Sequence, residues 1–93
     1  MNANNYHDEQ NKQNILKMRA VLETLPGFCK IFFRGMEEYT SSRTRLAYAY
    51  DIRLFFEYLH ENNPVCNKME ITEYPLSILD DIKRMDIEEY LQY

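Results

Sequence analysis

Apolar residues recur at helical spacing along most of the chain. A first stripe begins near Gln13 and predicts a short amphipathic helix over residues 13–24, which Pro26-Gly27 brings to an end. A second stripe, from Phe28 to Tyr39, predicts another helix. The two stripes consist of Ile15, Met18, Leu22 and Leu25, and of Phe28, Ile31, Phe32, Gly35, Met36 and Tyr39. Because Gly35 lies on the second stripe, we expect it to mark a close approach between helices.

The longest predicted helix starts at the hydroxyl residues Thr40-Ser41-Ser42 and ends before Pro64. Any of the three hydroxyls can accept a hydrogen bond from a free N–H group in the first turn. Plotted at about 100° per residue, this helix shows two apolar faces. The core face carries Tyr48, Ala49, Ile52, Phe55, Phe56 and Leu59, and the opposite face carries Arg43, Ala47, Tyr50 and Leu54, with Leu46 and Arg53 at its edge and Tyr58 further along.

The remaining segments are short. Residues 65–74 are predicted to be a loop, Pro75 leads into tight helical turns, and a last helix carries Ile87, Tyr90 and Leu91 on one face. No alternating segment is long enough to found a sheet, so the pattern predicts an all-α domain of about four to five helices. Residues 1–12 are polar and lack a period, and we expect a disordered tail there, followed by a single helical domain over 13–93.

Composition and charge limit the function classes. The chain has 93 residues, a net charge of −4 and a pI near 5.1, which excludes nucleic-acid binding by bulk charge. Residues 27–60, however, carry five basic against four acidic side chains, whereas residues 61–93 carry three against eight. Any DNA contact is therefore expected in the middle third of the chain.

The side chains that common catalytic and metal sites require are missing or badly spaced. With two glycines the chain cannot build a phosphate-cradling loop, and Cys29, Cys66, His7 and His60 have no metal-ligand spacing. The acidic cluster over residues 80–89 lacks a neighbouring histidine. We therefore expect no metal, no cofactor and no independent catalysis. No apolar stretch is long enough to span a bilayer and the first residues do not resemble a signal peptide, so a cytoplasmic location is expected.

The second face of the central helix needs a partner. A further helix of the same domain could cover its C-terminal half, at Leu54 and Tyr58. Its N-terminal half is small, hydroxylated and basic, a mixture that suits a groove of DNA better than a protein core. This half consists of Ser42, Arg43, Ala47, Tyr50 and Arg53.

Residues 28–93 resemble the N-terminal core-binding domain of tyrosine recombinases, the phage-integrase family. The resemblance rests on the joint Tyr39-Thr40-Ser41-Ser42-Arg43-Thr44, on Ala47-Tyr48, Asp51-Ile52, Phe55-Phe56 and Leu59, and on Ile82, Asp86-Ile87 and Tyr90-Leu91. It implies a SAM-like orthogonal helical bundle that clamps one face of a recombination site. A separate catalytic domain of the parent recombinase performs the strand exchange in that family.

The resemblance also implies roles for single residues and partners. Ser42 and Thr44 bind phosphates or cap the helix, while Arg43, Ala47, Tyr50 and Arg53 face double-stranded DNA, and weaker backbone contacts fall to Arg45, Lys30 and Arg34. The implied partners are DNA, the catalytic domain of the same parent and further recombinase protomers. Because the family's catalytic Arg, Lys, His and nucleophilic Tyr lie in the absent domain, this chain is not expected to cut DNA.

The sequence departs from the family pattern at two places. Lys83 stands where the family usually has a Thr or Ser cap, so Asp80 or Asp81 is expected to cap the last helix instead. The family's final basic helix does not follow, and Tyr93 is expected to be a cut inside a longer protein. An alternative function remains open: a helical protein-interaction module whose Tyr/Leu face and acidic C-terminal third bind another protein, without DNA.

Overall fold

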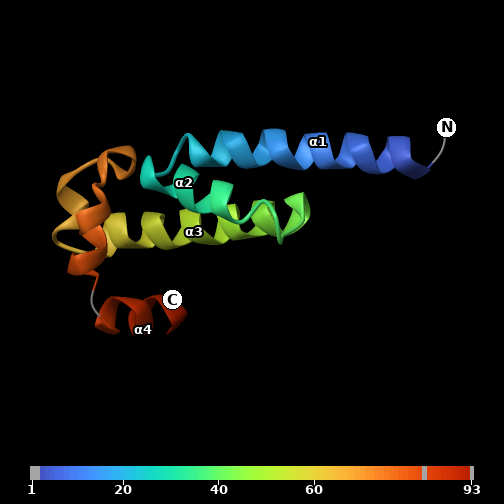
Figure 1. Cartoon of the computed structure of the whole chain (residues 1–93). Coiled ribbons are helices and arrows are strands. Elements are labelled where there is room, and N and C mark those ends of the chain that lie inside the picture. Colours follow the sequence, from blue (N-terminus) through green and yellow to red (C-terminus); the bar gives the residue numbers. More distant parts are fainter. Residues whose placement is uncertain (1–2, 83, 93) are drawn as a thin grey trace.

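The computed structural model describes residues 3–82 and 84–92 and is helical throughout (Figure 1). The helices are α1 (Ala3–Leu22), α2 (Phe28–Gly35), α3 (Ser42–Asn62), the 3₁₀ helices η1 (Cys66–Lys68), η2 (Ile71–Glu73) and η3 (Leu76–Asp81), and α4 (Arg84–Gln92). Those residues contain no strand. The predicted all-α fold, a small helical bundle, is confirmed.

The first three α-helices lie lengthwise beside one another (Figure 1). Helix α1 packs along α3, and the molecule measures 53 × 26 × 20 Å along its principal axes. The short connections after α1 and α2 reverse the direction of the chain. Ala49 of α3 is fully buried, and its small side chain leaves room for the neighbouring helices to pack on α3.

Helix α1 begins much earlier than predicted. We expected residues 1–12 to be a polar tail and the helix to start near Gln13, whereas residues 3–12 are helical. These residues include no proline or glycine, and Gln, Glu and Lys among them are good helix formers. The prediction was wrong because it looked for an apolar period, and this part of α1 has none.

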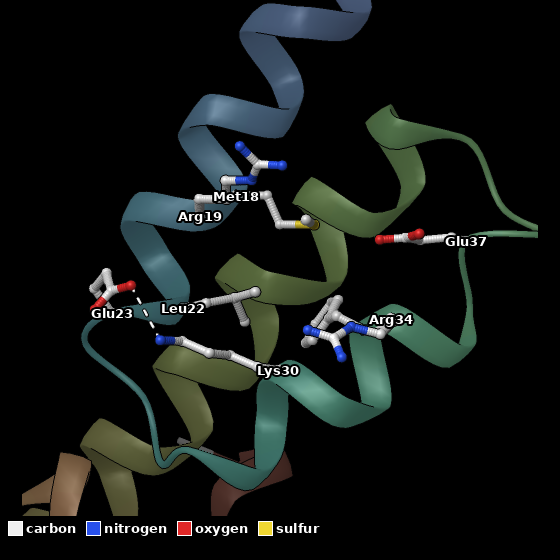
Figure 2. A pocket seen from close by; sticks show the side chains of 8 residues that line it. Met18, Arg19, Leu22, Glu23, Lys30, Arg34 and Glu37 are labelled. Carbon is white, nitrogen blue, oxygen red and sulfur yellow. Dashed lines mark hydrogen bonds and ion pairs between the residues drawn. The ribbon is translucent and has the colours of Figure 1, made fainter.

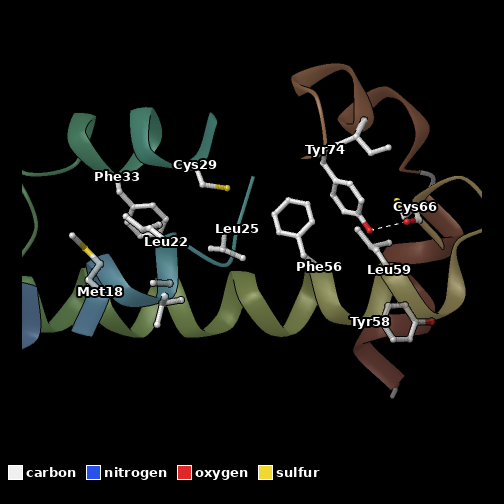
Figure 3. Close-up of a cluster of buried hydrophobic side chains, with 13 residues drawn as sticks. Met18, Leu22, Leu25, Cys29, Phe33, Phe56, Tyr58, Leu59, Cys66 and Tyr74 are labelled. Carbon is white, nitrogen blue, oxygen red and sulfur yellow. Dashed lines mark hydrogen bonds between the residues drawn. The ribbon is translucent and has the colours of Figure 1, made fainter. Parts of the chain in front are cut away.

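The register of α2 also differs from the prediction. Its buried residues are Cys29 and Phe33, whereas Ile31 and Phe32 of the predicted stripe are 71% and 52% exposed. Apart from its chain neighbours and the backbone of its own helix, no atom of the described residues lies within 4 Å of the point where a Cβ on Gly35 would be, so Gly35 does not mark close packing. The helix is short and apolar on several sides, which allows two registers, and the contact of Phe33 with α1 decides between them (Figure 3).

The core runs along α3 in two adjoining parts (Figure 3). The first part joins α1 and α2 to α3, and the second joins α3 to the segment after it. Their buried members include Met18, Leu22, Leu25, Cys29 and Phe33 in the first part and Phe56, Leu59, Cys66, Tyr74 and Ile78 in the second. The Tyr74 hydroxyl donates to the Cys66 carbonyl at 2.9 Å. The segment predicted as a loop, residues 65–74, is therefore two packed 3₁₀ turns, η1 and η2.

Helix α4 docks on the C-terminal half of α3 through aromatic rings. The Tyr90 ring lies 5.0 Å from that of Phe55 and 5.3 Å from that of Tyr58, measured between centroids. The Asn63 side chain donates to the Asp86 carboxylate at 3.1 Å. The final helix is confirmed, and Tyr58 is buried beneath it as one alternative predicted. Lys83 and Tyr93 lie outside the described residues.

The buried Cys29 thiol makes the free energy of unfolding depend on pH in the alkaline range. Burial raises the pKa of Cys29 from its ordinary value of 9.0 to about 11. The unfolded chain therefore loses this proton first, and the stability that the neutral thiol contributes is complete below pH 9 and lost between pH 9 and 11. We expect the free energy of unfolding, measured in urea, to fall across that interval. A Cys29→Ala chain that shows the same fall would contradict this assignment.

Candidate nucleic-acid interface

The face of α3 opposite the core is open from Arg43 to Leu54, whereas Tyr58, further along, is buried. Arg43, Ala47, Tyr50 and Leu54 are spaced three to four residues apart along this helix and are all exposed, Tyr50 by 38% and Leu54 by 56%. This placement confirms that α3 has a second face. The face is hereafter called the open face of α3. The prediction that a further helix of the same domain covers Leu54 is wrong.

Arg53 lies at the edge of the open face, beside Tyr50 and Glu57. Its guanidinium carbon lies 5.2 Å from the centroid of the Tyr50 ring, and its Nε lies 3.8 Å from the Glu57 carboxylate. The ring face attracts the cation, whereas a partly exposed ion pair contributes little. Because Glu57 and Glu61 continue the face towards the C-terminus and are exposed, its positive charge is confined to the first three turns.

The hydroxyl groups at the start of α3 have roles that differ from the predicted ones. Ser41, which is exposed, caps the helix by accepting a hydrogen bond from the Thr44 N–H at 3.1 Å. Ser42 is 8% exposed, and its hydroxyl accepts from the Asn14 amide of α1 at 3.3 Å. Thr44 is half-buried and its hydroxyl accepts from Ser41 at 2.9 Å. Ser42 faces α1, because α1 extends past the start of α3.

Arg45 is buried instead of lying on the open face. Only 7% of it is exposed, and its Nη1 donates to the Thr40 carbonyl at 2.6 Å and to the Thr40 hydroxyl at 3.3 Å. Its Nε is buried and has no partner among the described residues. This arginine holds the turn that precedes α3. The sequence pattern could not separate it from Arg43, since both follow the same hydroxyl joint.

Lys30 and Arg34 lie in a separate groove between α1 and α2 (Figure 2). This groove of about 370 Å³ also contains Arg19, a cation that the sequence analysis did not single out. The Lys30 amine bonds the Glu23 carboxylate at 3.1 Å, and Glu37 adds a second carboxylate. The structure therefore brings these two predicted residues together with carboxylates and not with the open face of α3.

Known proteins give no independent identification. No family model, curated protein or solved structure matches the chain. The resemblance to the tyrosine recombinases consequently stays a prediction from the residues. Within the described ranges, the structure offers no helix of the length and apolarity needed to cross a membrane.

Proposed function

We propose that this chain is a DNA-binding module of the tyrosine recombinase type, a SAM-like core-binding domain that positions DNA for a catalytic domain elsewhere in the parent protein. The observation that carries the proposal is the open face of α3, where Arg43, Ala47, Tyr50 and Arg53 lie uncovered or half-covered on successive turns. A helix with one uncovered face fits the major groove of B-DNA, which is about 12 Å wide.

The side chains on this face have suitable chemistry. Arg43 and Arg53 offer guanidinium forks to phosphates or to guanine edges, and Ala47 leaves room for close approach of the helix. The N-terminus of α3 adds first-turn N–H groups and a partial positive charge. Ser42, buried against α1, takes no part in the proposed contact, and Thr44 contributes to the cap.

The affinity is expected to be low and sensitive to salt. The net charge is −4, and Asp51, Glu57 and Glu61 are exposed on α3 itself. Non-specific complexes of DNA-binding proteins typically have dissociation constants of about 10⁻⁴ to 10⁻⁶ M. We place this chain at the weak end of that range.

An NMR titration of the ¹⁵N-labelled chain with a short DNA duplex at low salt tests the proposal. We expect the amides of residues 41–53 to shift, and the shifts to reverse when salt is added, because phosphate contacts release counterions. Amides of η1 and η2, far along the chain, serve as the internal control. If the amide signals of residues 41–53 do not shift while the spectrum keeps the dispersion of a folded chain, the proposed function is contradicted.

Exposed apolar side chains favour a second candidate, the helical protein-interaction module. Ile31, Leu54 and Leu91 are 71%, 56% and 76% exposed, on three different helices. Loss of a protein partner on substitution of Tyr50 or Leu54, without any DNA binding by the unchanged chain, would favour this candidate.

A further inference from the structure

We propose that the N-terminal half of α1 forms one wall of a phosphate-binding groove whose other wall is the start of α3. The groove has an open volume of about 1010 Å³ and lies between these two helices and the turn before α3. Its ligand is a phosphodiester of the DNA backbone. The inference rests on the proposed function, since the duplex that lies on the open face of α3 delivers the phosphate.

The wall formed by α1 is lined by side-chain amides. Towards α2, the side of α1 that packs on α3 is apolar, with Met18 and Leu22 buried. Closer to the N-terminus the same side carries Gln10, Asn11 and Asn14, all of which line the groove. Asn14 is buried and donates to Ser42, whereas Gln10 and Asn11 are exposed. Neutral amide donors are common ligands of DNA phosphates.

The wall formed by the start of α3 offers cationic and backbone donors. Arg43 is exposed and lines the groove, next to the capping residue Ser41. The first-turn N–H groups of a 21-residue helix point the same way along its axis. Together these groups form the positive side of the groove.

Arg45 adds a second cation to the residues that line the groove. The residue is 7% exposed, its Nη1 donates to Thr40, and its Nε has no partner in the described part of the chain. A buried N–H without an acceptor is costly, and an anion nearby lowers that cost for the whole guanidinium.

Two carboxylates in the groove repel a free anion. Asp8 and Glu37 also line the groove, and formally they balance Arg43 and Arg45. Inorganic phosphate should therefore bind too weakly to detect at millimolar concentration. A phosphodiester held by a duplex that already contacts Arg43 and Tyr50 binds at a much higher effective concentration.

The side-chain signals of the full chain give the direct test. On titration with a short duplex we expect the Arg45 Nε–H signal and the NH₂ signals of Gln10 and Asn11 to shift together with the amides of residues 41–44. Inorganic phosphate at about 1 mM, roughly tenfold above the weak end of non-specific DNA binding, is the second arm and should leave them in place. Shifts caused by phosphate but not by duplex would assign the groove to a free anion and overturn the inference.

Two matched substitutions complete the test. Gln10→Glu puts a carboxylate in the groove and should weaken duplex binding by about fivefold, whereas Gln13→Glu, the same change at an exposed site on α1 outside the groove, should weaken it by less than about twofold. Asn11→Asp repeats the test at a second amide. Equal effects of Gln10→Glu and Gln13→Glu on duplex binding would overturn the inference that the groove binds a phosphodiester. If Arg43→Glu still removes binding in that case, the proposed function stands; if it does not, both fail.

Discussion

Reversing the charge of Arg43 and Arg53 together is expected to abolish DNA binding and leave the fold intact. Both side chains lie on or beside the open face, and neither contributes to the buried core. Each reversal removes a phosphate or base contact and adds a repelling carboxylate, which we expect to cost about tenfold or more in affinity at low salt. Two such losses from an already weak complex leave no binding that fluorescence anisotropy can measure.

The matched control carries the same change in net charge at other places. Arg34→Glu with Lys68→Glu also lowers the net charge by four units, but Arg34 lies in the groove between α1 and α2 and Lys68 in η1. We expect this chain to keep most of its DNA affinity, with circular dichroism unchanged in both variants. Equal losses in the two chains would show that only the overall charge matters, and the open face would lose its role.

The open face could be predicted from the sequence because α3 is long and strongly patterned. Its period separates Ala49, Phe56 and Leu59 from Arg43 and Ala47 without any knowledge of the neighbouring helices, and their exposures agree with that separation. Finer assignments failed for a physical reason. Ser41 and Ser42 are equivalent as residue types, and only the path of α1, which covers Ser42, makes Ser41 the exposed cap.

The two errors at the start of the chain have different causes. Residues 3–12 carry no apolar signal, so their helix rests on intrinsic propensity and on continuity with the packed half of α1. In α2 the apolar signal is too rich, because Phe28, Ile31, Phe32 and Phe33 fall within a single eight-residue helix. A period read over so short a segment does not fix which face is buried, and packing against α1 and α3 decides it.

The register of α2 leads to the prediction with the largest effect on stability. Phe33 is 2% exposed in the core, whereas the adjacent Phe32 is 52% exposed. Phe33→Ala should lower the free energy of unfolding by about 3–5 kcal/mol, which is the usual cost of emptying a buried aromatic site. Phe32→Ala should cost less than about 1 kcal/mol, since its side chain is half exposed and its ring makes an edge contact with Phe28 at 6.0 Å between centroids.

Urea unfolding of both variants followed by circular dichroism measures this difference directly. Small domains have total stabilities of about 5–15 kcal/mol, so Phe33→Ala should shift the midpoint far towards zero urea or leave the chain unfolded in water. Phe33→Leu, which keeps an apolar side chain in the site, should recover part of the loss and show that the site itself tolerates substitution. A larger loss for Phe32→Ala than for Phe33→Ala would instead place the predicted stripe of Phe28, Ile31 and Phe32 in the core, and α2 would then be rotated about its axis relative to the arrangement in Figure 3.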